Sequence, residues 1–492
     1  MSNLPLYLRV LLLFVIWIMT IALLLATVIK EQLGNAEWRN NSGFLNHPLR
    51  RKVINFLVRS GVTFGLKLFF IIITLWFIVQ TLLKAYKLTQ PGAFLSDFRW
   101  YYVASKMVLE GLNLYQPETF VNYFIQVVTP RNAMPFVYPP NIIPLILPLG
   151  YFSSYYASTI WVIANLLAII LSIWGSVHLI DSPRKNWQVI GAIICFLVYG
   201  TTYSLIVGNI ALIVSALVIW SIVQAKKGRS ILAGILLGIS AIKPTLAVLF
   251  ILYFLFKRRF KLVIVCGMTA VIMTGIGLVM TGNSIPEFIH LYKQGYELFF
   301  QHFYNAPNKS YGRIDAVVIG YRLFTNNIIM AKLTSNLIVI IASCLICFYI
   351  YRRNKSIRFV KEISLSEISL IACLSVLYTY SQGSNSSILV LCGVFFINEL
   401  LTVVKNNNLT LQWISLWSGG FFCLLIHTSI GYNLLTPAWK PSTSPISLSL
   451  IYKQTIAASP SYAIVGLSFF ILAIAHLSLN KAKDELLVGN EN

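Results

Sequence analysis

Acidic side chains are scarce in this chain: Asp and Glu supply only 15 of its 492 residues, against 38 Lys and Arg. Charged residues make up 11% of the chain, and the long hydrophilic stretches that separate soluble domains are missing. A mean hydropathy of +0.76 and apolar runs that recur from Leu11 to Leu479 exclude an ordinary soluble protein. Many of these runs approach the roughly 18–20 residues that cross a bilayer, so we predict one all-α polytopic integral membrane protein.

Cysteine and nucleotide-binding motifs are also scarce. All seven cysteines lie in apolar segments. Cys344 and Cys347 have the spacing of a redox motif, but they lie inside a hydrophobic run without a metal-binding partner, which favours a packing role. The sequence has no Walker-type loop, Rossmann fingerprint, zinc-ligand spacing or Ser-His-Asp arrangement. We therefore expect no cofactor and no metal, and nothing indicates a nucleotide-sugar or ATP site.

The net charge of +23 is compatible with nucleic-acid binding, but the basic residues are gathered in short loops between apolar runs. This pattern is the positive-inside bias, which sets the orientation of a membrane protein. We therefore expect membrane lipids, and no nucleic acid, as partners for this charge. The loops assigned to the cytoplasm on this basis carry basic clusters at residues 50–59, 184–185, 226–229, 257–261, 352–361, 405 and 481–483.

With these loops inside, we expect an outside N-terminus, an inside C-terminus and external loops at residues 88–140, 282–327 and 431–458. The first apolar run lacks a basic leader and a small-residue cleavage site, so it is interpreted as a retained helix. The segment 142–152 is too short to span and rich in proline, which predicts a half-helix or re-entrant element. Crossings are expected near residues 8–29, 68–87, 157–180, 189–206, 210–225, 230–242, 245–256, 262–281, 328–350, 366–380, 388–404, 411–430 and 459–479.

Four polar features share the outer side in this topology: Asp97, Tyr138, Asn209 and Lys243. Lys243 is flanked by apolar residues on both sides. An ammonium this close to hydrocarbon is costly, so Lys243 should face a cavity or pair with an anion such as a lipid phosphate. A lysine that snorkels to the interface is the alternative.

Asp97 is a carboxylate between apolar helices, and we predict that it is a catalytic base. An ordinary aspartate is ionised at neutral pH and can accept a proton from a hydroxyl. Burial among aromatic side chains would raise its pKa and improve it as a base. Ser96 and Asp97 also precede a helical pattern that ends at Glu110 and Gly111, so either could instead be the N-cap of that helix.

Two other segments carry groups that could bind a substrate. Arg313 and Arg322 in the external loop 282–327 suit bidentate recognition of phosphate, and a solvated loop is the alternative. Residues 378–387 form a polar turn suited to binding a sugar, although a merely polar turn explains the composition equally well.

Five short motifs occur in a recognisable order along the chain. They are Asp97-Phe98-x-x-Tyr101-Tyr102-x-Ala104, Gly111-x-x-x-Tyr115, Tyr138-Pro139-Pro140, Gly208-Asn209 and Gly238-x-x-x-x-Lys243-Pro244. This order, over about residues 68–400, resembles glycosyltransferase family 87, which has the GT-C membrane fold and includes polyprenyl-phosphate-mannose-dependent mannosyltransferases. The resemblance implies that Asp97 is the catalytic aspartate and that Lys243 belongs to the family's lysine–proline turn.

The chain departs from the family pattern at two places. Asn209 stands where the family often has glutamine. The late turn reads Ser381-Gln382 where the family often has Ser-Pro, and Ser387 stands where a histidine would fall. A role for that histidine is therefore not carried over to this chain.

The apolar runs predict about 13 transmembrane helices, and the resemblance implies that they form a GT-C-like bundle with its catalytic core at residues 68–400. An extra N-terminal helix and basic loop (residues 1–67) precede this core, and C-terminal helices with a cytoplasmic tail (residues 401–492) follow it. We expect a plasma-membrane enzyme that moves a mannose-like hexosyl or a pentosyl residue from a polyprenyl-phosphate sugar. The acceptor would be a glycolipid or glycan on the extracytoplasmic face.

In the expected reaction, Asp97 removes the acceptor proton in an inverting displacement and Lys243 stabilises the departing phosphate. The alternative is a flippase or transporter of a lipid-linked sugar, which would use the same cavity without a base. Such proteins are expected to carry internal repeats, and no clear repeat is visible in the sequence. The residues expected to bind substrate are Tyr101, Tyr102, Tyr138, Asn209, Lys243, Arg313 and Arg322.

Overall fold

The computed structural model describes residues 96–128, 133–180, 199–302, 305–307, 313–324, 327–353 and 362–395, with residues 79, 82, 83, 86 and 398. Within these ranges the chain is helical and forms no strand, apart from an isolated antiparallel bridge between Arg313 and Gln382. The all-α class predicted from composition is therefore confirmed for the described part of the chain.

The structure describes thirteen α-helices and three 3-10 helices in these ranges. In order they are α5 (Phe98–Leu109), α6 (Pro117–Val127), η2 (Pro140–Ile142), α7 (Ile143–Ile146), η3 (Leu147–Tyr151), α8 (Ser154–Leu179), α10 (Tyr199–Val207), α11 (Ala211–Lys226), α12 (Ser230–Ser240), α13 (Pro244–Phe256), α14 (Phe260–Thr281), α15 (Ile285–Gln301), α16 (Ala316–Leu323), α17 (Ile328–Arg353), α19 (Leu365–Leu377) and η4 (Gly383–Leu389).

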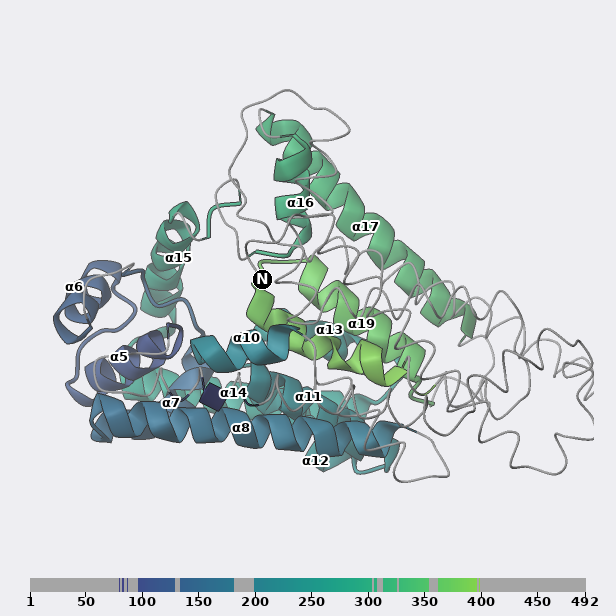
Figure 1. The fold of residues 1–492 in the computed structure, drawn as a ribbon, viewed down its shortest axis with the longest axis horizontal. Coiled ribbons are helices and arrows are strands. Elements are labelled where there is room, and N and C mark those ends of the chain that lie inside the picture. Colours follow the sequence, from purple (N-terminus) through teal and green to yellow (C-terminus); the bar gives the residue numbers. More distant parts are fainter. Residues whose placement is uncertain are drawn as a thin grey trace, which may run out of the picture.

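Most of the described helices pack into one bundle, and the amphipathic helices α5, α6 and α15 lie at one end of it. Figure 1 shows α8 along one edge of the bundle, with α11, α12 and α14 packed behind it. Helices α5, α6 and α15 lie together at one end, and α16 packs along α17. This arrangement leaves the N-terminus of α5 beside the junction of α10 and α11, where the candidate site lies.

Three described helices, α8, α14 and α17, are long and apolar enough to cross a membrane, and each coincides with an expected crossing. The described residues also form shorter apolar helices of 10–17 residues, which overlap expected crossings except for Pro140–Tyr151, the segment expected to be a half-helix. The total of about 13 crossings stays a prediction, because the segments 8–29, 411–430 and 459–479 lie outside the described residues. The shorter helices are α11, α12, α13, α19 and the two proline-rich or late segments Pro140–Tyr151 and Gly383–Phe395.

The segment expected to be a half-helix is a short, broken helix built from η2, α7 and η3. Its three prolines each remove a backbone donor, which explains why the helix changes type twice within twelve residues. It packs on α14, where Gly277 has no side chain to hold the two backbones apart. A Cβ at Gly277 would collide with the carbonyl oxygen of Pro140.

Two of the three expected external loops contain helices, and the third, residues 431–458, lies outside the described residues. The loop 88–140 holds α5 and α6, and the helical pattern expected after Asp97 is confirmed as α5. The loop 282–327 holds α15 and α16. Helix α15 lies in a segment that was expected to be a loop. Its apolar residues recur at helical spacing, so the helix has an apolar, aromatic face.

A buried ion pair joins α13 to α19. The Lys257 ammonium lies 2.9 Å from Oε2 of Glu367, and both side chains are fully buried. Tyr253 donates a hydrogen bond of 2.8 Å to the same carboxylate. Lys257 was counted with a cytoplasmic basic cluster, but in the structure its ammonium is buried inside the bundle, where it pairs with Glu367.

Candidate active site

Asp97 occupies the N-cap position of α5, but its side chain makes no capping hydrogen bond. Its backbone N–H donates to the carbonyl of Val207 at 2.7 Å, which fixes the start of α5 against the end of α10. Its carboxylate accepts a hydrogen bond of 2.6 Å from Nδ2 of Asn209 and a longer one of 3.5 Å from Ser96. The carboxylate is therefore held by Asn209, at the junction of α10 and α11, and not by the backbone of α5.

Asn209 lies in the tight turn between α10 and α11. Gly208 adopts a φ of +70°, a conformation that glycine reaches without steric strain, and so allows the turn. The Asn209 side chain is fully engaged by the protein. Its Nδ2 donates to Asp97, while its Oδ1 accepts from the N–H of Ala211 at 2.9 Å and from the Lys243 ammonium at 2.8 Å. Asn209 thus bridges the acid and the amine.

Lys243 lies in the turn between α12 and α13, and Pro244 begins α13. The side chain is 9% exposed, so its ammonium is buried and does not snorkel to the surface. Burial lowers the pKa of Lys243 to about 7, and the nearby Asp97 charge opposes that shift. Among the described residues the Lys243 ammonium donates a hydrogen bond to Asn209 alone, so it has donors left for an anion.

The Asp97 carboxyl is perturbed in the opposite direction. Burial raises the pKa of Asp97 above its ordinary value, and the Asn209 hydrogen bond and the Lys243 charge each offset part of that shift. A raised pKa makes a carboxylate a better proton acceptor, which is the property required of a general base.

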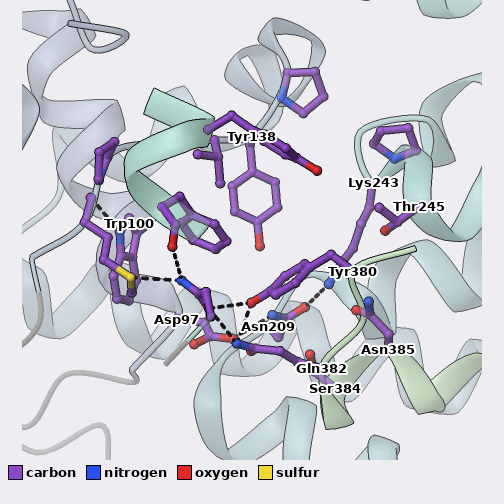
Figure 2. A pocket seen from close by; sticks show the side chains of 18 of the residues that line it. Asp97, Trp100, Tyr138, Asn209, Lys243, Thr245, Tyr380, Gln382, Ser384 and Asn385 are labelled. Atoms are coloured by element: carbon purple, nitrogen blue, oxygen red, sulfur yellow. Dashed lines mark hydrogen bonds between the residues drawn. The ribbon is translucent and has the colours of Figure 1, made fainter. Parts of the chain in front are cut away.

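Asp97, Tyr138, Asn209 and Lys243 all line one cavity of about 420 Å³. Figure 2 shows Asp97 and Asn209 low in the view, Lys243 extending toward Asn209 from the right, and Tyr138 above Asn209. The structure therefore brings together the four features that the sequence placed on one side of the membrane. Of the described residues that line the cavity, only Asp97 and Lys243 carry charge.

Tyr101 and Tyr102 lie in α5 behind the cavity wall and do not line the cavity. The Tyr101 hydroxyl lies 2.7 Å from the hydroxyl of Tyr138 and accepts the N–H of Ile210 at 3.3 Å. Tyr102 points away and donates to the carbonyl of Phe152. Tyr101 is thus placed to orient Tyr138, whereas Tyr102 ties α5 to the broken helix.

Arg313 is engaged by protein groups and does not line the cavity. Its guanidinium makes two hydrogen bonds of 2.8 and 2.9 Å to Asp315 and a third of 2.7 Å to the carbonyl of Asn305. It also lies 4.9 Å from the ring centroid of Tyr380, which does line the cavity. The backbone of Arg322 belongs to α16, and its side chain lies outside the described part of the structure.

The structure adds two groups of lining residues that were not singled out as site residues. The polar turn 378–387 contributes Tyr380, Gln382, Ser384 and Asn385, so it faces the same cavity as Asp97. Its composition had suggested sugar binding, but nothing in the sequence placed it beside Asp97. The second group is the aromatic face of α15, formed by Tyr292, Tyr296, Phe299 and Phe300.

The aromatic face of α15 could have been found from its spacing. Tyr292, Tyr296 and Phe299 or Phe300 recur at intervals of three to four residues, as on one side of a helix. The late-turn residue Ser387, which stands at the family's histidine position, bonds with Ser215 of α11 at 2.8 Å and does not line the cavity. The described residues also hold no group of three or more His, Cys, Asp or Glu that could bind a metal ion.

Residues 136–377 match the model of glycosyltransferase family 87. The chain belongs to glycosyltransferase family 87. No curated protein and no solved structure matches the chain.

Membership of family 87 makes this chain a membrane glycosyltransferase. Three of the four residues that meet in the cavity, Tyr138, Asn209 and Lys243, lie inside the matched range. Asp97 precedes it, and the late turn follows it. Their place in the site therefore comes from the tertiary structure and not from the family match.

Proposed function

We propose that this family 87 glycosyltransferase transfers an uncharged sugar residue, either a mannose-like hexosyl or a pentosyl residue, from a polyprenyl phosphate. The acceptor is a hydroxyl of a glycolipid or glycan, and the reaction takes place on the extracytoplasmic face of the plasma membrane in a GT-C-like fold. The observation that supports this proposal is the line Asp97–Asn209–Lys243 in the wall of one cavity. In this line a carboxylate and an ammonium bond to opposite ends of one neutral amide, and the proposal assigns them the roles of proton acceptor and phosphate-binding cation.

The proposed reaction is a single inverting displacement. The acceptor oxygen forms a bond to the anomeric carbon while the bond from that carbon to the phosphate oxygen breaks. The acceptor proton passes to the Asp97 carboxylate, and the bonding electron pair leaves with the phosphate. Lys243 stabilises the charge that grows on the leaving oxygen, which lowers the barrier because the interaction is strongest in the transition state.

The other expected residues act at different distances from the substrate in this proposal. Tyr138 lines the cavity and meets substrate directly, with Tyr101 holding its hydroxyl. Arg313 acts on Tyr380 and is a positioning residue, not a phosphate ligand. Asn209 likewise positions Asp97 and Lys243, since both ends of its amide are used within the protein.

The test is Asp97→Asn in vesicles that contain the full chain, polyprenyl-phosphate mannose and an extracted glycolipid acceptor. Asparagine is nearly the same size, so the fold should survive, while loss of the base should lower kcat about a hundredfold or more. The matched control is Glu118→Gln, which removes the charge of an exposed carboxylate on α6 away from the cavity.

Two outcomes would contradict the proposal. Unchanged transfer by Asp97→Asn would remove the base assignment. Movement of the mannosyl lipid across the bilayer without a new glycosidic bond would favour the flippase that the sequence left open.

A further inference from the structure

Three polar side-chain atoms on the cavity wall have no hydrogen-bond partner within the described protein. They are Oγ1 of Thr245, Oγ of Ser384 and Oδ1 of Asn385. Thr245 lies at the start of α13, two residues after Lys243, and the other two lie in η4. Figure 2 shows Thr245 and Asn385 on the same side of the cavity as Lys243.

These atoms are buried, which makes their lack of partners informative. Ser384 is fully buried and Asn385 is 2% exposed. Buried polar atoms in folded proteins nearly always have a partner, because leaving one unsatisfied costs free energy. Neighbouring lining groups follow that rule: the Tyr380 hydroxyl donates to Asn305 at 2.6 Å, and Gln382 donates to Tyr380. The residues of these three atoms also line the cavity, so a molecule that enters the cavity can supply the missing partners.

The chemistry of the three side chains indicates what enters. Two hydroxyls and an amide carry no charge, and they suit partners that donate and accept hydrogen bonds, such as sugar hydroxyls. The charged lining residues, Asp97 and Lys243, are assigned to the acceptor proton and the phosphate. An acidic or amino sugar would find no counter-charge left among the described lining residues. The aromatic rings of α15 and Tyr380 supply the apolar surface against which a sugar ring packs.

We propose that Thr245, Ser384 and Asn385 form a donor-sugar subsite that binds the hydroxyls of an uncharged sugar and selects it. The inference rests on the proposed function, because Lys243 binds the phosphate and Thr245 follows it by two residues, which places the sugar attached to that phosphate against the three side chains. These residues determine specificity; they take no part in the bond-making step.

The experiment separates binding from transfer by omitting the acceptor. Purified full-length protein in nanodiscs is titrated with polyprenyl phosphate and with the same lipid carrying mannose, glucose, galactose or arabinose. The measured quantity is the ratio of affinities for the sugar-bearing and the bare lipid. The test variant is Thr245→Val with Ser384→Ala, which removes two hydroxyls that make no bond within the described protein and should leave folding intact.

The matched control is Thr201→Val with Ser381→Ala. Both hydroxyls are also buried and without a partner in the described protein, but neither residue lines the cavity. We expect the wild type and the control to prefer at least one sugar-bearing lipid. The test variant should lose about tenfold of that preference, with its affinity for bare polyprenyl phosphate unchanged.

Two results would overturn the subsite: no sugar preference in the wild type, or the same preference in the test variant as in the control. The absence of a sugar preference in the wild type would mean that only water binds to the three atoms. Failure of the proposed function would give a different result. If Asp97→Asn retained transfer, the base assignment would fail, but the wild type would still prefer sugar-bearing lipid and the test variant would still lose that preference.

Discussion

Asn209 donates a hydrogen bond of 2.6 Å from its side-chain amide to the carboxylate of Asp97. The other end of the same amide accepts from Lys243 at 2.8 Å. The acid and the amine are therefore coupled through a neutral group and do not form a direct ion pair within the described structure. This separation matters because a direct pair would lower the basicity of the carboxylate and occupy the ammonium that the phosphate needs.

Asn209→Ala should consequently damage catalysis more than folding. Without the spacer, Asp97 and Lys243 can approach each other, and we expect kcat to fall about tenfold or more and the KM for donor lipid to rise. Steady-state transfer kinetics in vesicles measure both. Ser96→Ala, which removes only the longer 3.5 Å contact to the same carboxylate, should change kcat far less. Equal effects of the two variants would show that the spacer has no special role.

The pH dependence of transfer should report Asp97 and Lys243 together. Asp97 acts deprotonated, so activity rises as pH increases through its raised pKa. Lys243 acts protonated, and burial lowers its pKa to about 7, so kcat/KM should fall as pH rises through that value. A bound anionic phosphate favours the ammonium, and the falling limb of kcat should therefore lie at higher pH.

Lys243→Arg provides the check on this assignment. Guanidinium stays protonated over the accessible range, so the falling limb should disappear from any activity that the variant keeps. A falling limb that stays near pH 7 in Lys243→Arg would assign it to another group.

The buried ion pair of Lys257 and Glu367 should matter for stability and not for transfer, since neither residue lines the cavity. Lys257→Met leaves a buried carboxylate without its cation and should destabilise the protein by about 3–5 kcal/mol. Lys257→Met with Glu367→Leu removes both charges and should cost less than the single change. Unfolding by denaturant in detergent measures both, and a double variant less stable than the single one would contradict this account.

Gly277 should not tolerate a side chain, because Pro140 of η2 packs directly against it and not because helix α14 needs a glycine there. In Gly277→Ala the new methyl group would push η2 away from α14 and move Tyr138, which lies two residues before Pro140. We expect lower stability and weaker transfer. Gly267→Ala on the same helix meets nothing within 4 Å and should be neutral or slightly stabilising. Thermal unfolding and transfer rates of the two variants compare them directly.

Much of the fold could be predicted because hydropathy and proline act locally. The apolar runs predicted α8, α14 and α17 to within a few residues, and the prolines predicted a broken element after Tyr138. The helices α6 and α15 were not predicted, because short amphipathic helices in a polar stretch resemble loops in composition. The buried charge of Lys257 was also missed, since a lysine in a basic run looks like a solvated one.

The candidate site could be predicted only in part. Asp97, Asn209 and Lys243 stood out because charge and amide groups are unusual among apolar helices. Arg313 was singled out because arginine suits bidentate recognition of phosphate, but its guanidinium bonds to Asp315 and lies against Tyr380, which no local pattern indicates.

By itself the sequence determined that this chain is a helical membrane protein and that a few polar residues interrupt its apolar runs, since both follow from composition and local spacing. Only the tertiary structure decided which of these residues meet. Asp97 and Asn209 are 112 residues apart in the chain, and Asn209 and Lys243 are 34 apart. Contacts over such separations depend on how whole helices pack, and for that reason the spacer between acid and amine, and the unsatisfied atoms beside them, became visible only in the fold.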